Sequence, residues 1–312
     1  MTGIHFLCAP GNSDFIARCV GADVPSVVSL VGAGGKTSTL FWLAQALAGC
    51  GQRVLLTTTT RMFRPEPGRG ATLLIEPERA QRLAALRGLP NAPGIVALYS
   101  QIDANEGKVI GFEPDEIDEL KAMAVADVIL VEADGARHCA LKAPAAHEPC
   151  IPRGSNAVIA LTGAAPLGCP ANPADIHRWP QFAAITGLRA GDPINQIALG
   201  RLLAHPEGMF KNTPAQASRH WLVNSQGALD ASVPAMLAQL ARDHRSLNGV
   251  WIGNMQQSKP FSHAWVRTQA GRGHCQLGQT LSPKRLRHNV EGYNFAQFER
   301  SLRCHPFVAE PG

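Results

Sequence analysis

Apolar runs alternate with helical patterns along most of the chain. The run SVVSLV at 26–31 is β-rich and has no polar alternation, which is typical of a strand buried on both faces. Leucines then recur at helical spacing between Leu40 and Leu47, and glycines follow as a helix stop. The next run, RVLLTTTT at 53–60, again has the composition of a strand. This order predicts a βαβ unit, in which a crossover helix joins two parallel strands.

The same alternation continues to residue 253. We expect further strands near 71–75, 94–101, 108–112, 127–133, 156–162, 219–223 and 248–253, and further helices near 77–87, 114–125, 180–187, 193–204 and 231–242. A long Pro-rich loop is expected from 135 to 153. These elements together predict an α/β fold built on one doubly wound, mostly parallel sheet, with 248–253 as its last strand.

Charge divides the chain into two parts. The formal net charge of +5 falls entirely within 259–312, since the first 258 residues contain equal numbers of basic and acidic side chains. We therefore expect a folded α/β domain over 1–258 and a basic C-terminal extension over 259–312, partly disordered or surface-bound. The extension has no aromatic stacking motif, so nucleic acid is not indicated as a partner.

Composition also limits the class of protein. No apolar run reaches the roughly 18 residues of a membrane-spanning helix, and the first residues lack the pattern of a secretion signal. We therefore expect a cytoplasmic protein without membrane attachment. The eight cysteines form no CxxC pair, and in a reducing compartment we expect free thiols.

A glycine-rich loop separates the first predicted strand from the first predicted helix. Its residues are Gly32, Ala33, Gly34, Gly35, Lys36, Thr37 and Ser38. Glycines allow backbone amides to approach phosphate oxygens, the helix N-terminus adds positive potential, and a lysine and a hydroxyl can serve the terminal phosphates and Mg²⁺. The loop therefore predicts ATP or GTP binding with Mg²⁺ and a sheet of the P-loop NTPase type. The alternative, a turn that only packs helix on strand, leaves Lys36 and Thr37 unexplained.

The spacing of this loop differs from the common phosphate loop. It reads GxxGK(S/T), two residues shorter than GxxxxGK(S/T), and is similar to the ATP loop of Mur-type amide ligases. The choice between ATP and GTP stays open at this point.

Two carboxylates follow a buried strand further along. Glu132 and Asp134 are spaced i, i+2 after the apolar run at 128–131, so they can reach a nucleotide's magnesium at the carboxyl end of the sheet. We assign Thr37, Glu132 and Asp134 to the metal, and Lys36, Glu132 and Asp134 to catalysis. A solvated turn after a buried strand is the alternative.

Polar residues elsewhere are further candidates for the site. Thr59 and Thr60 end the second strand, where a hydroxyl could serve magnesium or phosphate, although β-propensity alone also explains them. Lys142, His147 and Glu148 lie in the loop past the carboxylates, where α/β sheets place their substrates. A lysine can hold an anionic cofactor and a histidine can transfer a proton, while the alternative is an ordered loop with a surface His–Glu contact.

These motifs together resemble a known family, the YqeC-type accessory proteins of selenium-dependent molybdenum hydroxylases. The resemblance spans about 26–255 and rests on VGAGGKTS at 31–38, VLLTTTT at 54–60, VILVEADGAR at 128–137, LKAPAAHEP at 141–149, the pair His177-Arg178, ITGLRAGDPI at 185–194 and LLAHPEGMFKNTP at 202–214. It implies a cytoplasmic nucleotide-binding maturation factor that helps to insert selenium into, or to deliver, the molybdenum cofactor. The implied partners are the hydroxylase itself or other cofactor-maturation proteins.

Three functions remain open on the sequence alone. The first is an NTP-hydrolysing maturation protein. The second is an ATP-dependent ligase related to the Mur enzymes, although their large central and C-terminal domains do not fit within 312 residues. The third is a non-catalytic scaffold in which the nucleotide only gates docking.

Overall fold

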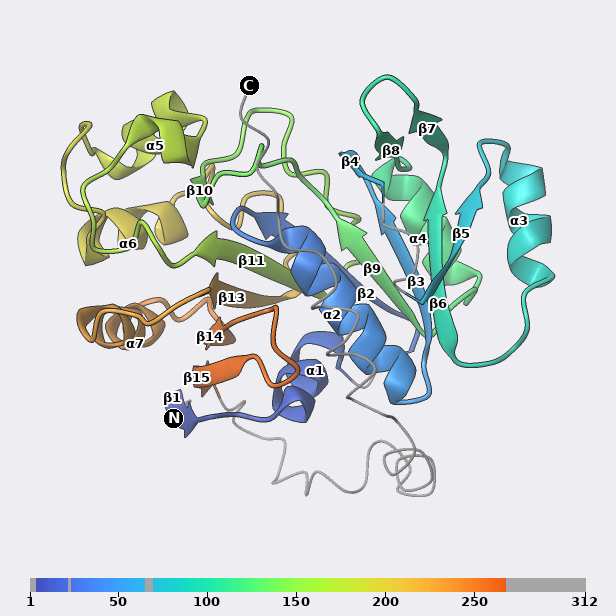
Figure 1. Ribbon diagram of the computed structural model, residues 1–312, viewed down its shortest axis with the longest axis horizontal. Coiled ribbons are helices and arrows are strands. Elements are labelled where there is room, and N and C mark those ends of the chain that lie inside the picture. Colours follow the sequence, from blue (N-terminus) through green and yellow to red (C-terminus); the bar gives the residue numbers. More distant parts are fainter. Residues whose placement is uncertain (1–3, 22–23, 65–69, 268–312) are drawn as a thin grey trace.

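The computed structural model describes residues 4–21, 24–64 and 70–267 of the chain. Within these residues a ten-stranded sheet crosses the whole molecule (Figure 1). Its strands lie in the order β1 (Ile4–Cys8), β15 (Phe261–Arg267), β14 (Gly249–Gly253), β13 (Ser218–Asn224), β11 (Ala157–Gly163), β2 (Ser26–Gly32), β9 (Val128–Glu132), β3 (Arg53–Thr58), β6 (Gly94–Tyr99) and β5 (Ala71–Ile75). The strands from β14 to β5 are all parallel, and β15 and β1 add an antiparallel ribbon at one edge.

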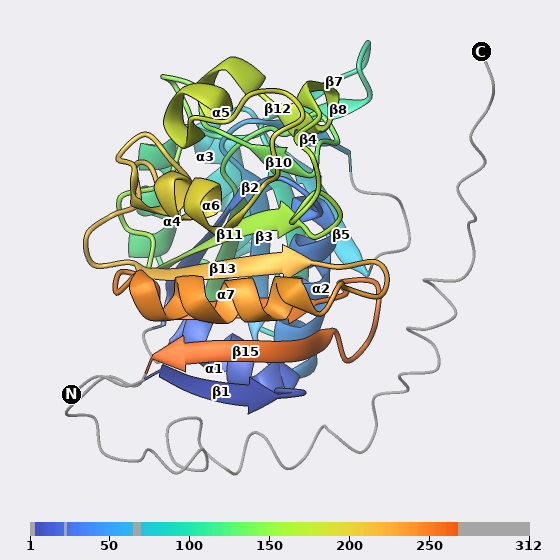
Figure 2. The ribbon, with the colours of Figure 1, turned by 90° about the vertical axis from the view of Figure 1, so that its left-hand side faces the viewer.

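Helices cover both faces of this sheet. Successive residues of β2 alternate between the two cores: Val28 and Leu30 join one cluster, and Val27 and Val31 join the other. The first cluster is covered by α1 (Asn12–Val20) and α2 (Lys36–Gly49). The second is covered by α3 (Arg79–Arg87), α4 (Pro114–Ala122), α6 (Gln196–Ala204) and α7 (Ser232–Asp243), the last packing on β14 and β15 and seen between β13 and β15 in Figure 2. Burial on both faces explains why the parallel strands read as continuous apolar runs.

Smaller elements are added beyond the sheet. Helix α5 (Trp179–Thr186) packs on α6, and β10 (Leu141–Lys142) pairs in parallel with β12 (Ile176–His177), which follows the short 3-10 helix η1 (Pro173–Asp175). A separate antiparallel sheet contains β4 (Arg61–Phe63), β8 (Lys108–Ile110) and β7 (Gln101–Asp103).

The α/β class and the large, mostly parallel sheet predicted from the sequence are confirmed. Four details were wrong. The last strand is β15 rather than 248–253, the run at 94–101 is interrupted after Tyr99, and the 135–153 loop contains the short strand β10. The strand expected near 108–112 is β8, which belongs to the separate antiparallel sheet and not to the doubly wound one. The strand β15 lies on the C-terminal side of residue 258, and the rest of the expected basic extension, 268–312, lies outside the described residues. Among the helices of the described part of the chain, none combines the length and apolar character needed to cross a bilayer.

Strand connections bring several loops together at one edge of the sheet. From β2 the chain runs through α2 to β3, whereas β9 lies between β2 and β3 and leads to β11 on the other side of β2. The connections therefore diverge at the carboxyl ends of β9, β2 and β11. Such a switch point opens a crevice in which doubly wound folds bind their ligands.

Candidate nucleotide site

The glycine loop joins β2 directly to α2 and lies against the end of β11. Gly34 has φ +83°, and a side chain there would collide with the backbone nitrogen of Gly163. Gly32, with φ +93°, approaches the carbonyl of Leu161 in the same way. Only glycine combines a positive φ with so close a backbone approach, so these positions fix the path of the loop.

The first turn of α2 has no protein cap. Gly35 is the N-cap residue and offers no side chain, and the first helical hydrogen bond runs from Thr39 N to the Gly35 carbonyl at 3.0 Å. Among the described residues, no acceptor bonds the backbone N–H groups of 34–38. Unpaired amides at a helix N-terminus, together with the helix dipole, form an anion-binding site.

Two amides of the same loop are already used within the protein. Gly32 N donates to Asp134 Oδ2 at 2.9 Å, and Ala33 N donates to the Leu161 carbonyl at 2.9 Å. The amides of 34–38 are therefore the ones left without an acceptor among the described residues.

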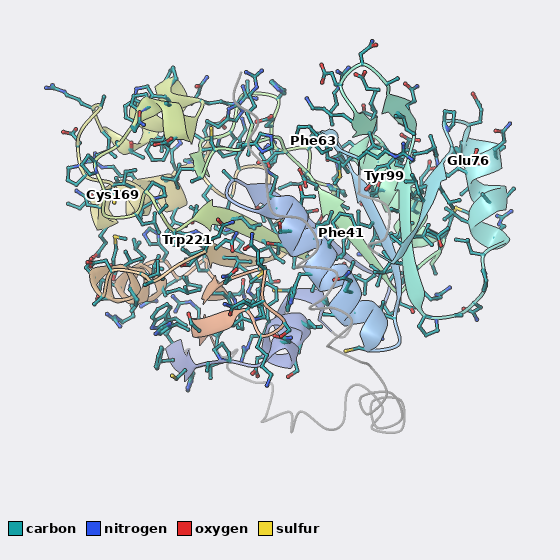
Figure 3. All side chains as sticks on the ribbon, viewed as in Figure 1. Phe41, Phe63, Glu76, Tyr99, Cys169 and Trp221 are labelled. Atoms are coloured by element: carbon teal, nitrogen blue, oxygen red, sulfur yellow. The ribbon has the colours of Figure 1, made fainter. Side chains whose placement is uncertain are left out.

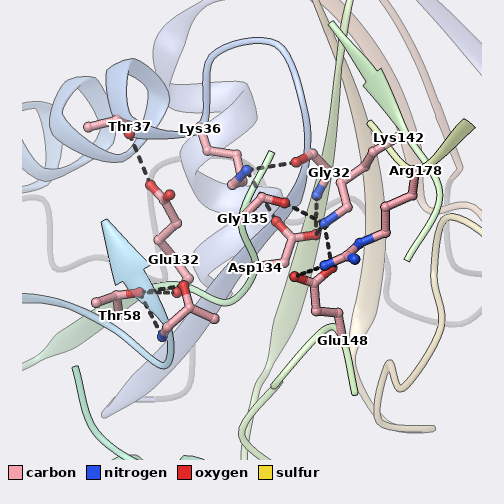
Figure 4. A network of polar contacts seen from close by, with 11 residues as sticks. Gly32, Lys36, Thr37, Thr58, Glu132, Asp134, Gly135, Lys142, Glu148 and Arg178 are labelled. Carbon is pink, nitrogen blue, oxygen red and sulfur yellow. Dashed lines mark hydrogen bonds and ion pairs between the residues drawn. The ribbon is translucent and has the colours of Figure 1, made fainter. Parts of the chain in front are cut away.

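Lys36 is buried, with 6% of its surface exposed, and folds back over the loop. Its Nζ donates to the Gly32 carbonyl at 2.7 Å and lies 3.1 Å from Asp134 Oδ1 (Figure 4). Burial lowers the pKa of Lys36, but the carboxylates of Asp134 and Glu132 outweigh it, and the net pKa is raised. The side chain therefore carries a positive charge close to the uncapped helix end.

The predicted carboxylates both lie beside the first turn of α2. Glu132, the last residue of β9, accepts a hydrogen bond from Thr37 Oγ1 at 3.1 Å through Oε2. Burial raises the pKa of Glu132, and Lys36 and Thr37 only partly offset this. Asp134 contacts Lys36 and the Gly32 amide as given above.

Three oxygen-bearing side chains beside the first turn of α2 would hold a magnesium ion. Within the described residues no three His, Cys, Asp or Glu side chains converge to form a complete metal site. The groups available are the Thr37 hydroxyl and the carboxylates of Glu132 and Asp134. Hard oxygen donors in this number suit Mg²⁺, which completes its shell with nucleotide phosphates and water.

The threonines that end β3 connect strand ends to each other. Thr58 Oγ1 donates to the Glu132 carbonyl at 2.7 Å and lies 3.2 Å from Thr60 Oγ1. Thr59 Oγ1 donates to the Cys150 carbonyl at 2.6 Å. In this arrangement the candidates Thr59 and Thr60 hold the loops around Glu132.

Lys142 and Glu148 extend the site into a chain of buried ion pairs. Lys142 Nζ lies 3.0 Å from Asp134 Oδ2 and 3.0 Å from Glu148 Oε2 and donates to the Gly135 carbonyl at 2.6 Å. Glu148 Oε1 lies 2.9 Å from Arg178 Nη2. Cations and carboxylates therefore alternate from Lys36 to Arg178 across the carboxyl edge of the sheet (Figure 4).

The chain of ion pairs shifts the pKa values of Glu148 and His177, which lie near its Arg178 end. Burial alone would raise the pKa of Glu148, but Arg178 and Lys142 lower it to about 2. The pKa of His177 is lowered by burial and then by Lys142 and Arg178. Glu148 is therefore an anion at any physiological pH.

His147 lies apart from Lys142 and Glu148, the residues with which it was predicted, whereas two residues that were not predicted belong to the site. His147 is exposed and makes no side-chain contact with the ion-pair chain. Arg178 and Asn224 were not predicted in the site. Asn224, at the end of β13, donates through Nδ2 to the Gly34 carbonyl at 2.8 Å and accepts from Met255 N at 3.2 Å. Its one sequence signal is a polar residue that closes an apolar strand.

Comparisons with known proteins place the chain in a family. A family model described as "YqeC protein" matches residues 28–180, which include the glycine loop and the ion-pair chain up to Arg178. The chain is 40% identical over 243 residues to a protein of Escherichia coli (strain K12) named "Uncharacterized protein YqeC", an alignment that covers 78% of this chain and 92% of that protein. No solved structure matches the chain. As its motifs predicted, the chain belongs to the YqeC family.

Proposed function

We propose that the chain is a Mg²⁺-dependent nucleotide-binding protein, an ATP or GTP hydrolase, that acts as an accessory factor in the maturation of a selenium-dependent molybdenum hydroxylase. Its client would be that hydroxylase or another protein of cofactor assembly or delivery. The nucleotide part of the proposal rests on the site, and the maturation part rests on the resemblance of the motifs to the YqeC-type accessory proteins.

One observation carries the nucleotide assignment. The N–H groups of 34–38 find no acceptor among the described residues, at the start of a buried helix and at the switch point of the sheet. Native proteins rarely leave such groups without a partner. A polyphosphate supplies several oxygens at the spacing of a loop of amides and is favoured by the helix dipole.

The side chains around this loop have matching roles. Lys36 would leave Asp134 and neutralise charge on the transferred phosphoryl group. Thr37 and Asp134 would hold magnesium, which when bound neutralises phosphate charge and orients the terminal phosphates. Glu132, buried and hydrogen-bonded to Thr37, would orient the attacking water directly or by way of the metal shell.

A nucleotide-gated scaffold is the second candidate, and the ion-pair chain favours it. The pair between Lys36 and Asp134 must open when Lys36 turns to a phosphate, and Asp134 is tied through Lys142 and Glu148 to Arg178 at the start of α5. Nucleotide binding alone would therefore change contacts at α5 without hydrolysis. A Mur-like ligase is the third candidate and requires two further substrates.

Calorimetry with Mg-ATP and Mg-GTP tests the assignment. We expect one of them to bind the intact chain, and Lys36→Ala to abolish binding while the thermal unfolding temperature shows a folded protein. Lys108→Ala, which removes a partly exposed lysine paired with Glu106, is the matched control and should bind normally. Equal affinity of the Lys36→Ala variant and the intact chain would refute the role of the loop.

Product analysis separates the three functions. A maturation hydrolase should release phosphate slowly alone and faster with its client hydroxylase. A ligase should form ADP and an amide only with both further substrates present. A scaffold should bind nucleotide without turnover even when the client is added.

A further inference from the structure

We propose that a cavity beside the phosphate loop binds a second substrate, a small anion with a carboxylate or phosphate group, and that Arg137 is the residue that recognises it. This inference rests on the proposed nucleotide function. The cavity has a volume of about 470 Å³, which is within the range of small-molecule sites. Its polar wall is formed by Arg137, His138, Cys139, Cys169, Asn172 and Asp175.

The cavity shares its wall with the phosphate loop. Ala140 lines the cavity, and its carbonyl accepts a hydrogen bond from Gly163 N at 2.8 Å. Gly163 is the residue against which Gly34 of the phosphate loop packs. A ligand in the cavity would therefore lie one layer of backbone away from the nucleotide's phosphates.

The wall is also connected to the ion-pair chain. The segment 137–140 lies between Asp134 and Lys142, which are joined to each other at 3.0 Å. On the opposite wall, Cys169 lies on the side of the molecule where α5 and α6 pack (Figure 3). A change in the contacts of Asp134 on nucleotide binding would therefore shift the segment 137–140, which lines the cavity.

A strained turn places Arg137 at this wall. Arg137 and His138 have φ values of +45° and +62°, and Cys139 N donates to the Ala136 carbonyl at 2.9 Å. Positive φ at both central positions defines a type I′ turn, for which Gly, Asn and Asp are strongly preferred. The sequence has arginine and histidine at these two positions, so their side chains, rather than the backbone conformation, explain why these residues occur there. Backbone strain of this kind is concentrated at binding sites.

The wall carries one cation without a protein partner among the described residues, the exposed Arg137, and one carboxylate, Asp175. Within the described part of the chain, the Arg137 guanidinium has no ion pair or hydrogen bond, whereas Asp175 accepts a hydrogen bond from Asn172 Nδ2 at 2.9 Å. The His138 ring lies 5.3 Å from the Phe63 ring. Burial raises the pKa of the Cys139 thiol, the Asp175 carboxylate raises it further, and Arg137 offsets this in part, so the thiol is neutral at physiological pH. A free guanidinium suits the paired oxygens of a carboxylate or phosphate.

The thiol of Cys139 provides the test on the full-length protein. Iodoacetate, an anion, and iodoacetamide, its neutral analogue, alkylate the same thiolate, so the ratio of their rates at one cysteine reports the local attraction for anions. Peptide mass mapping measures this ratio at Cys139 and at Cys8, an exposed cysteine on the edge strand β1 that serves as internal control. One unit charge at about 4 Å in a watery environment changes this ratio about fivefold, and the Asp175 carboxylate on the same wall acts against Arg137, so the effect of Arg137 is measured by removing it.

Matched variants identify the source of the attraction. Arg137→Gln should lower the ratio at Cys139 about fivefold and leave the ratio at Cys8 unchanged, whereas Arg189→Gln, which removes an exposed arginine outside the cavity wall, should change neither. Inorganic phosphate or acetate in excess should slow iodoacetate at Cys139 and not at Cys8, and the stronger competitor names the anionic group of the substrate. The proposal is overturned if Arg137→Gln leaves the ratio unchanged, or if neither anion protects.

Failure of this proposal can be told apart from failure of the nucleotide site. The Arg137→Gln variant should retain full affinity for the Mg-nucleotide in the same preparation, because Arg137 lies outside the phosphate loop. Loss of nucleotide affinity in this variant would show that Arg137 serves the nucleotide itself and would overturn the separate cavity.

Discussion

Removing the charge of Glu148 should uncouple α5 from the glycine loop and destabilise the fold. In Glu148→Gln the shape is kept, but Lys142 and Arg178 lose the carboxylate that lies 3.0 and 2.9 Å from them. The pKa of Glu148 falls from an ordinary 4.5 to about 2, and at 1.36 kcal/mol per pKa unit this corresponds to about 3 kcal/mol. Because Arg178 is 25% exposed, solvent screening reduces the expected loss to about 2 kcal/mol at pH 7.

The pH dependence of this loss has a definite sign. Between about pH 4.5 and 2 the unfolded chain protonates Glu148 and the folded chain does not, so acid favours unfolding. The stabilisation is complete above pH 4.5 and disappears as the pH approaches 2. The stability difference between the intact chain and Glu148→Gln should therefore shrink over this range.

Urea unfolding followed by tryptophan fluorescence at several pH values measures both effects, since Trp221 and Trp251 are fully buried. Glu119→Gln is the control: Glu119 pairs with Arg79 at the surface, with both side chains more than half exposed, and should cost less than about 1 kcal/mol. A loss at Glu148 no larger than at Glu119, or one that does not change between pH 4.5 and the lowest pH at which the protein folds, would refute the buried chain.

Three further predictions follow from the same contacts. Gly34→Ala should lower the free energy of unfolding by about 2 kcal/mol or more and abolish nucleotide binding. Gly51→Ala, at a similar positive φ but with no atom in the way, should lower the free energy of unfolding by only about 1 to 2 kcal/mol and bind normally. Urea titration measures the stability of both variants and calorimetry measures their nucleotide binding. Glu132→Gln should keep nucleotide affinity and lower phosphate release roughly a hundredfold; unchanged release would exclude Glu132 as the residue that orients water. Replacing Arg137 and His138 together by glycine should raise the free energy of unfolding by about 1 kcal/mol, because the strain relieved exceeds the added chain entropy, and a lower unfolding temperature would contradict the strained turn.

Most of the strands that the sequence predicted are buried on both faces, although β5 and β8 were predicted as well and are only partly buried. In β9 and β11 every residue is buried, so the apolar runs are continuous and easily recognised. The strands β1 and β15 were missed because they form the antiparallel edge, where β1 has mostly exposed or half-buried residues and no long apolar run. The helix α1 was missed as well, because it has only nine residues and three buried side chains, Phe15, Cys19 and Val20.

The candidate site was predictable where local sequence determines it. The glycine loop and Lys36 lie on one strand–helix junction, and the carboxylates of Glu132 and Asp134 end a recognisable strand, so topology alone brings them together. Arg178 and Asn224 were missed since their partners lie 30 and 190 residues away, at Glu148 and Gly34. Local sequence does not reveal such contacts, nor does it fix the outward direction of a loop side chain such as that of His147.

A crystal soaked with a non-hydrolysable magnesium triphosphate tests the central claim most directly. The account predicts phosphate oxygens on the amides of 34–38, with Lys36 Nζ moved from Asp134 to the terminal phosphate. An empty loop with Lys36 still 3.1 Å from Asp134, under conditions that saturate ordinary nucleotide sites, would contradict it.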